Sequence, residues 1–457
     1  MSLTREMIAF AMDTDYRGLP VSVRHAASRC VLDHLGCVIG GMRTDLGRIV
    51  AGQVMQEGGE PQATLVASGG KRVPAVAAAL ANGTAANALD FDDTLVGHPG
   101  STVIAAALAT AEYGHRDGPD LLAAVTIGYE VCSRIASFWQ PIGGRYRHVF
   151  DTATLETFGA VAAAGRLLDL SLAEFENAFG IAAATAPIPR VRKAEGEGGV
   201  LRPMLKSTWG WASAAGVRAA LLAKAGLTGQ AHSLDGENLI WRLQPRVPGI
   251  DLKSPEDRLG EFYFIERTEF KPYPACRFLH STLEALSRLV ELEAIGWDEI
   301  AKVEVHSFDL LGDPYHYILK PSSHSEAQFS TPFCAAALLY HGRLTADAFT
   351  PEGLAHKEVL ALAQKVTVGV DPEYQQAYPQ QLGSRVRVSN SRGEEWQMDC
   401  NHPRGGPSNP LDDAELNHKF VDLAGRHFSP SESRGLAKRI LNIEQESNIR
   451  DFMGALG

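Results

Sequence analysis

The sequence lacks a concentrated run of basic residues, a long apolar run and a signal-peptide core. Its 43 Lys and Arg residues are outnumbered by 54 Asp and Glu residues, which gives a formal net charge of -11. Nucleic-acid binding needs a concentrated basic surface, so we expect no nucleic-acid partner. A membrane span needs about 20 largely apolar residues in succession, so we also expect no membrane partner. The charged N-terminal stretch does not resemble a signal peptide.

Cysteine is scarce, and the six cysteines are widely spaced, with neither a CxxC pair nor a Cys/His cluster at zinc spacing. This pattern is typical of free thiols in a reducing compartment, and we predict a cytoplasmic protein. The sequence also lacks GxGxxG after a strand-like run and the phosphate-binding GxxxxGK[ST]. We therefore expect neither a metal nor an organic cofactor.

Helical periodicity dominates the first part of the chain, because apolar residues recur at three- and four-residue spacing from residue 20 to about 265. Short alternating segments at 302–308, 365–370 and 385–400 predict half-buried strands. Helical patterns return beyond Pro410 and are expected to rejoin the first domain. The prediction is a mainly α protein, with an all-helical domain of residues 1–265 completed by 405–457 and a smaller α+β lid domain of residues 266–404.

The strongest local feature is LDFDDTLVGHPGSTV at 89–103, where Asp90, Asp93, Thr94 and His98 crowd near one predicted helix end. If the helix extends to Thr94, Asp90 and Thr94 share a face. Carboxylates at a helix C-terminus oppose its dipole, which favours a functional cluster over a merely solvated helix end. A divalent cation is a weaker alternative, because no further ligands stand in register.

Three basic residues are candidates for binding an anion. Lys206 stands near the start of a predicted helix, where its ammonium group and the helix N–H groups would bind a carboxylate. The alternative is an exposed lysine whose stem lies along the surface. Lys271 and Arg277 flank the turn in FKPYPACRFLH, and Arg offers a bidentate donor.

Cys276 and His280 are four residues apart and would share a helix face. A thiol–imidazole pair suggests a nucleophile, although such pairs on helices are more often packing, and no third orienting group is indicated. His148, before the helix that begins near Thr152, is as consistent with a loop residue as with a ligand-binding one.

These segments, in this order, resemble the MmgE/PrpD family, which includes 2-methylcitrate dehydratase, cis-aconitate decarboxylase and iminodisuccinate epimerase. The resemblance spans nearly the whole chain. The six matching segments are ALDFDDT followed by HP at 88–99, TATLETFGAVAAAGRLL at 152–168, MLK followed by GWASAAGVRAALLAKAGLTG at 204–229, KPYPACRFLH at 271–280, EAQFSTPF at 326–333 and PRGGPSNPLDDAELNHKF at 403–420.

The resemblance implies a homodimer, an α+β domain inserted into the all-α domain, and an active site between the domains without an iron–sulfur cluster. It also implies catalytic roles for five residues: Asp90, Thr94, His98, Lys206 and Lys271. Substrate binding is assigned to five more: Asp93, His148, Cys276, Arg277 and His280. Two positions depart from the family pattern, because Phe150 stands where many members have a histidine, and Cys276 stands where the decarboxylase has one.

The expected function is a cofactor-independent hydro-lyase, similar to 2-methylcitrate dehydratase, that acts on a small di- or tricarboxylic acid. Asp90 or His98 would move the proton, Thr94 would orient substrate or water, and the lysines would hold the carboxylates. The alternatives are an epimerase or decarboxylase of the same family acting on a dicarboxylate, and a non-catalytic helical binding protein.

Overall fold

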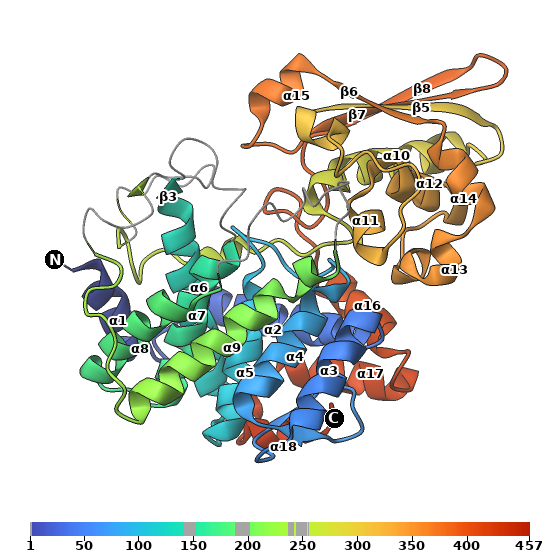
Figure 1. Ribbon diagram of the computed structural model, residues 1–457. Helices are drawn as coiled ribbons and strands as arrows, with labels where there is room; N and C mark the ends of the chain where they lie inside the picture. The colour runs from blue at the N-terminus through green and yellow to red at the C-terminus, as the bar shows by residue number, and fades with distance from the viewer. Residues whose placement is uncertain (1, 141–151, 188–201, 236–241, 244–253, 255) are drawn as a thin grey trace.

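The computed structural model describes residues 2–140, 152–187, 202–235, 242–243, 254 and 256–457 (Figure 1). The fold is mainly helical, as predicted, with one four-stranded sheet near one end of the molecule. His148 and Phe150 lie outside the described residues. Within the described part of the chain, no helix has the length and apolar character to cross a membrane.

The larger part, which we call the helical body, consists of helices from both ends of the chain. Its helices are α1 (Leu3–Asp13), α2 (Val21–Gly41), α3 (Asp45–Glu57), α4 (Ala75–Ala88), α5 (Ala105–Tyr113), α6 (Gly118–Phe138), α7 (Thr152–Leu167), α8 (Leu172–Thr185), α9 (Met204–Lys224), α16 (Asp413–Ala424), α17 (Pro430–Leu441) and α18 (Ile449–Gly454). Two-residue strands pair beside them: β1 (Ala63–Thr64) with β2 (Arg72–Val73), and β3 (Trp139–Gln140) with β4 (Arg242–Leu243).

Helices α4 and α9 approach each other so closely that glycine is required where they meet. A Cβ atom added at Gly210 would lie 2.3 Å from Thr84 Oγ1, and one added at Gly83 would lie 3.0 Å from the Cα atom of Gly210. This contact fixes the start of α9 relative to the end of α4. Lys206 lies in the first turn of α9, and Asp90 follows α4 by two residues.

The smaller part, which we call the sheet unit, is a four-stranded sheet covered on one face by helices (Figure 1). Its strands are β5 (Ile300–Ser307), β6 (Val366–Val370), β7 (Ser384–Asn390) and β8 (Glu395–Cys400), in the order β6-β5-β7-β8. Only β5 and β6 are parallel. Side chains along β7 alternate between buried and partly buried, as expected for a strand covered on one side. The structure has strands at all three segments for which alternation predicted them.

Two helices of the sheet unit contact the sheet, α10 (His280–Glu293) and α12 (Thr331–His341), and α14 (Lys357–Ala363) packs against α12 (Figure 1). The shorter α11 (His324–Phe329), α13 (Pro351–Leu354) and α15 (Pro372–Ala377) connect these elements. All buried members of this core lie between Ala275 and Cys400.

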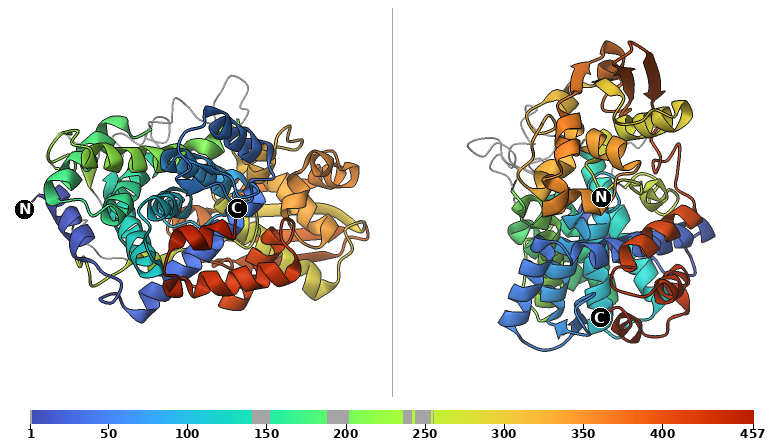
Figure 2. Two further views of the ribbon diagram at one scale, coloured as in Figure 1. Left: turned by 90° about the horizontal axis from the view of Figure 1, so that it is seen from below. Right: turned by 90° about the vertical axis from the view of Figure 1, so that its right-hand side faces the viewer.

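The last helices pack against the first ones rather than against the sheet. Helices α16 and α17 contact α2, and α18 contacts α5, and Figure 2 shows the red C-terminal helices beside the blue N-terminal ones. The largest core of the helical body accordingly joins residues from Leu19 to Leu456. The domain boundaries at 265/266 and 404/405 stay a prediction, with which this packing is compatible.

Candidate active site

Helix α4 ends at Ala88, so the helix does not extend through Asp90 to Thr94, and these two residues share no helix face. Asp90 has a φ of +50°, in the left-handed region that Asp tolerates better than most residues. Thr94 instead pairs antiparallel with Glu269: each backbone N–H donates to the other's carbonyl, at 2.9 and 2.8 Å. This bridge brings the segment before Lys271 alongside the segment after α4.

Asp90 is the centre of a buried ion cluster. Lys206 Nζ lies 2.9 Å from Asp90 Oδ2, and Lys271 Nζ lies 2.7 Å from Asp90 Oδ1. Lys271 Nζ also donates to the Asp90 carbonyl at 2.9 Å. All three side chains are at most 2% exposed. The fold therefore joins three predicted site residues that are far apart in the sequence.

Two ammonium groups share this one carboxylate. Burial would raise the pKa of Asp90, but Lys206 and Lys271 more than offset it and hold the pKa well below its usual range. Burial also opposes the charge on Lys271, yet Asp90 and Asp92 keep the pKa of Lys271 above its ordinary value. At Lys206 burial prevails over Asp90, and Lys271 adds repulsion, so the pKa of Lys206 is lowered. An anion bound beside Lys206 would relieve this deficit of negative charge.

Asp92 orients His98. The Asp92 carboxylate accepts hydrogen bonds from Ser101 Oγ at 2.5 Å and from Asn87 Nδ2 at 3.0 Å, and His98 Nδ1 lies 3.2 Å from it. Burial raises the pKa of Asp92, but His98 more than offsets it and brings the pKa to about 2. The His98 ring also packs edge-on against Trp209, with 4.6 Å between ring centroids. With Nδ1 directed at Asp92, Nε2 of His98 points away from that carboxylate.

Asp93 is engaged within the protein. One oxygen accepts from the backbone N–H of Gly100 at 2.9 Å, and the other accepts from the Tyr129 hydroxyl. Burial, with further repulsion from Asp33 and Asp92, raises the pKa of Asp93 well above its usual range. The Asp93 carboxyl group thus holds the segment after α4 against the π-helical turn at Gly100–Ile104.

Glu156 of α7 is a site neighbour that the sequence analysis missed. It accepts from the backbone N–H of His98 at 2.9 Å and from Thr102 Oγ1 at 2.8 Å. The hydroxyls of Thr102 and Ser101 therefore both donate to buried carboxylates. A carboxylate inside the apolar helical segment TATLETFGAVAAAG was the available signal.

Cys276 and His280 do not share a helix face, contrary to the prediction, because Cys276 precedes a short 3-10 turn. His280 is fully buried, and its Nε2 lies 3.1 Å from the Ala275 carbonyl. The imidazole nearest the sulfur belongs to His316, whose Nε2 is 3.8 Å from Cys276 Sγ. Arg277 pairs with Glu269 and donates to the Arg404 carbonyl.

Comparison with known protein families agrees with this arrangement. The MmgE/PrpD N-terminal domain matches residues 5–244, and the MmgE/PrpD C-terminal domain matches residues 273–445. The chain belongs to the MmgE/PrpD family.

Curated relatives of this MmgE/PrpD protein include enzymes of two kinds. Human cis-aconitate decarboxylase is 26% identical and covers 92% of this chain and 87% of its own length. A cis-aconitate decarboxylase of Aspergillus terreus is 24% identical over 99% of this chain and 96% of its own. The mitochondrial 2-methylcitrate dehydratase of Yarrowia lipolytica is 24% identical over 86% of this chain and 78% of its own.

A divalent cation fits this MmgE/PrpD site poorly. Asp90, Asp92 and His98 place one possible ligand atom each within 4.8 Å of one another. However, Lys206 and Lys271 already contact both oxygens of Asp90, and hydroxyl and amide donors already occupy Asp92. A bound cation would face two ammonium groups at close range, which is strongly unfavourable.

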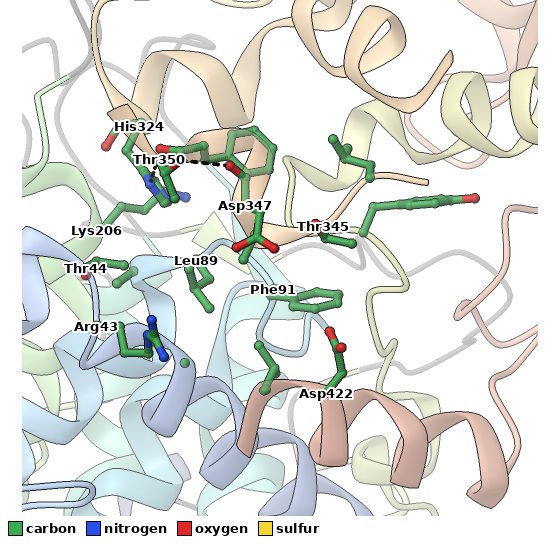
Figure 3. Close-up of a pocket in the computed structure, with 18 of the residues that line it drawn as sticks. Arg43, Thr44, Leu89, Phe91, Lys206, His324, Thr345, Asp347, Thr350 and Asp422 are labelled. Atoms are coloured by element: carbon green, nitrogen blue, oxygen red, sulfur yellow. Dashed lines mark hydrogen bonds between the residues drawn. The ribbon is translucent and has the colours of Figure 1, made fainter. Parts of the chain in front are cut away.

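Lys206 is part of the wall of a large cavity between the helical body and the sheet unit (Figure 3). Its volume is about 1450 Å³, and its described lining includes eight Lys or Arg side chains but four Asp or Glu side chains. His324 lies beside Lys206 at its edge. Burial and Lys206 lower the pKa of His324 to about 4, so this imidazole is neutral at pH 7. An acidic protein thus carries an interior surface with excess positive charge.

Proposed function

We propose that this chain is a lyase that acts on a small di- or tricarboxylic acid by acid–base proton transfer, with dehydration as the preferred reaction. The observation that supports it most is that side chains able to bind an anion lie near a histidine able to transfer a proton. Lys206 and Lys271 converge on Asp90, while the Asp92–His98 pair follows in the same segment.

Substrate carboxylates would bind beside Lys206 and Lys271. Their ammonium groups are buried, so charge that develops on carboxylate oxygens would be stabilised more strongly than in water. The excess of basic side chains along the neighbouring cavity would attract the anion towards Lys206.

His98 would act as the general base. Asp92 holds Nδ1, which leaves Nε2 to accept a proton from the carbon next to a carboxylate. The Thr94 hydroxyl is buried and has no hydrogen-bond partner among the described residues, so it is available to orient substrate or water. Asp90 would keep both lysines in place rather than take the proton, because its pKa is so low.

Decarboxylation is the second candidate, and the two cis-aconitate decarboxylases named above favour it. Both reactions need bound carboxylates and a positioned proton-transfer group. They differ in the product released: water after dehydration, carbon dioxide after decarboxylation. Epimerisation would release neither product and would introduce solvent deuterium into recovered substrate.

The test is turnover of citrate, 2-methylcitrate, cis-aconitate, iminodisuccinate, tartrate and malate, with both products and deuterium exchange followed by mass spectrometry. We expect His98→Gln to lower kcat at least about 100-fold, the usual minimum for a lost general base. His25→Gln is the matched control, because His25 also pairs with a carboxylate, Asp413 at 3.1 Å, but at the surface. Full turnover by His98→Gln would refute its role, and failure of every acid both to turn over and to stabilise the fold would favour the non-catalytic alternative.

We also propose that the protein is a cytoplasmic homodimer. Met204, Trp211 and Leu222 are 60%, 49% and 39% exposed and lie seven and eleven residues apart on α9. At that spacing they lie along one side of α9, which a second copy of the chain would cover. Analytical ultracentrifugation tests this: Trp211→Glu should shift a dimer to a monomer, whereas Leu292→Glu, at an exposed position in the sheet unit, should not.

A further inference from the structure

Three side chains of the sheet unit form a continuous thiol–imidazole–carboxylate chain. His316 Nε2 lies 3.8 Å from Cys276 Sγ, and His316 Nδ1 lies 2.9 Å from Asp313 Oδ1. The same Asp313 oxygen accepts backbone N–H bonds from Tyr315 at 2.9 Å and His316 at 3.0 Å. Backbone N–H groups of the same turn therefore hold the Asp313 carboxylate in place, and that carboxylate orients the His316 imidazole.

The imidazole is held rigidly and is charged at neutral pH. Phe278 and Phe329 pack against the His316 ring, with centroid distances of 6.0 and 5.7 Å. Burial disfavours the imidazolium, but hydrogen bonds to Asp313 and Cys276 outweigh burial and raise the pKa of His316 to about 9. Both ring nitrogens then carry protons, so Nε2 donates towards the sulfur. Asp313 is 25% exposed, which gives this buried chain an outlet to solvent.

The chain borders the lysine cluster. Both groups contact Phe329: Lys206 Nζ is 4.7 Å from the Phe329 ring centroid, and His316 packs against the same ring. The backbone N–H of Cys276 donates to the carbonyl of Gln328, the residue before Phe329, at 2.9 Å. Cys276 follows Lys271 by five residues, and the two side chains are close enough to interact electrostatically. The sheet unit thus brings a proton donor to the site whose base, His98, belongs to the helical body.

We propose that Cys276 is the general acid of this site and that His316 and Asp313 are positioning residues that reload it with protons. The proposal rests on the proposed lyase function. In dehydration, the C–H bond breaks, its proton goes to His98 Nε2, and its electron pair forms the C=C bond. The C–O bond breaks, and the departing hydroxide takes the Cys276 proton and leaves as water. His316 Nε2 then returns a proton to the sulfur, and solvent restores the His316 proton.

The other five cysteines offer no equivalent. They are at most 4% exposed, whereas Cys276 is 7% exposed. Burial raises the pKa of every one of those five thiols, to about 11 at Cys400. Among the described residues, none of their sulfur atoms makes a hydrogen bond to an imidazole. Iodoacetamide should therefore modify Cys276 first.

The first experiment measures thiol alkylation by mass spectrometry and needs no substrate. The charged and titratable groups that act on Cys276 are His316, Lys271 and Cys334. We expect His316→Gln to slow alkylation of Cys276 about tenfold at pH 7, because thiolate formation depends on a nearby cation. Cys400→Ser is the matched control and should leave the rate at Cys276 unchanged. An unchanged rate in His316→Gln would refute the relay.

The second experiment measures turnover of the acid that the wild-type protein dehydrates. Cys276→Ala should lower kcat about 100-fold with little change in KM, since the thiol donates a proton rather than holding the substrate. Asp313→Asn should lower kcat less and shift the alkaline limb of the pH profile to lower pH. Full kcat in Cys276→Ala would refute the acid role while leaving the lyase proposal intact.

The two proposals fail differently. If the wild-type protein turns over none of the acids, the lyase proposal fails. The acid role of Cys276 then fails as well, even if His316→Gln slows alkylation of Cys276. A stable mass increase equal to the substrate on Cys276 would also refute the acid role, because it would show a covalent nucleophile.

Discussion

The single carboxylate of Asp90 forms ion pairs with two buried ammonium groups, those of Lys206 and Lys271. Removing the carboxylate charge by Asp90→Asn would leave both buried lysines without the anion that they contact directly. We expect the free energy of unfolding to fall by about 3–5 kcal/mol, the usual cost of breaking a buried ion pair. Urea unfolding measures this. Asp45→Asn, which breaks the exposed pair with Arg48, is the control and should cost under about 1 kcal/mol.

Lys206 makes anion binding sensitive to alkaline pH. Its pKa is lowered, so Lys206 loses its proton below the pH at which an ordinary lysine does. We expect the Kd for citrate, measured by calorimetry between pH 7 and pH 10, to rise as Lys206 becomes neutral. Lys206→Arg should remove this dependence, because Arg stays protonated throughout that range. A Kd that is constant for the wild-type protein would contradict the placement of an anion beside Lys206.

Glu112 of α5 gives the fold a pH dependence of its own. Burial raises its pKa from 4.5 to about 7, although the Thr64 backbone N–H and hydroxyl donate to it. Its folded-state pKa is thus above its unfolded value, so its stabilisation is complete below pH 4.5 and is lost as pH rises through about 7.

The variant Glu112→Gln should therefore gain stability relative to the wild-type protein between pH 5 and pH 8. The gain corresponds to about 2–3 kcal/mol, from a shift of this size. Urea unfolding at the two pH values measures it, with the exposed residue Glu60 changed to Gln as control. An equal difference at both pH values would mean that Glu112 does not titrate with folding.

The sequence identified most members of the cluster but not their contacts. Carboxylates at a predicted helix end pointed to Asp90, and lysines at a predicted helix start and at a turn pointed to Lys206 and Lys271. Their meeting depends on the bridge between Thr94 and Glu269, a long-range pairing that no local pattern encodes. The role of His316 was equally invisible, because its partner Cys276 lies 40 residues away.

At the scale of elements, the crossing of α4 and α9 sets the position of Lys206. Gly210 follows Lys206 by one helical turn, and a methyl group there would collide with the Leu80 carbonyl at 2.4 Å. Gly210→Ala should push the helices apart, cost about 1–3 kcal/mol of stability and weaken citrate binding as Lys206 moves. Gly52→Ala in α3 is the control, since nothing lies within 4 Å of the added Cβ, and it should be neutral or stabilising. Unchanged binding in Gly210→Ala would show that this crossing does not position the lysine.

Periodicity predicted the types of the elements better than their ends. Alternation located β5, β6 and the β7–β8 hairpin, since one face of each strand is covered by helices. The sequence pattern does not define the end of α4, because the chain leaves the helix at an aspartate in the left-handed conformation, at a position without glycine or proline. Ser330 likewise ends α11 and caps α12, so the residue at the boundary of these two helices is neither glycine nor proline.

At the scale of the whole molecule, two separate hydrophobic cores meet across the cavity and the lysine cluster. A carboxylate held there would connect both cores. We expect citrate at 100 times its Kd to stabilise the protein by about 2.7 kcal/mol and to raise the unfolding temperature of both units together in calorimetry. Lys271→Met is the control and should abolish the shift. A shift confined to one unit would place the anion away from the junction.

The packing of α16 and α17 on α2 also determines when the protein can fold in the cell. Asp33 of α2 is buried against Lys419 of α16, which also donates to the Phe91 carbonyl. A ribosome adds roughly 5–20 residues per second, so the chain waits on the order of 10–40 seconds between completing α9 and completing α16. During that interval the groove for the last helices is open and Asp33 has no cation. Nascent chains should therefore depend on chaperones until the final helices emerge from the ribosome.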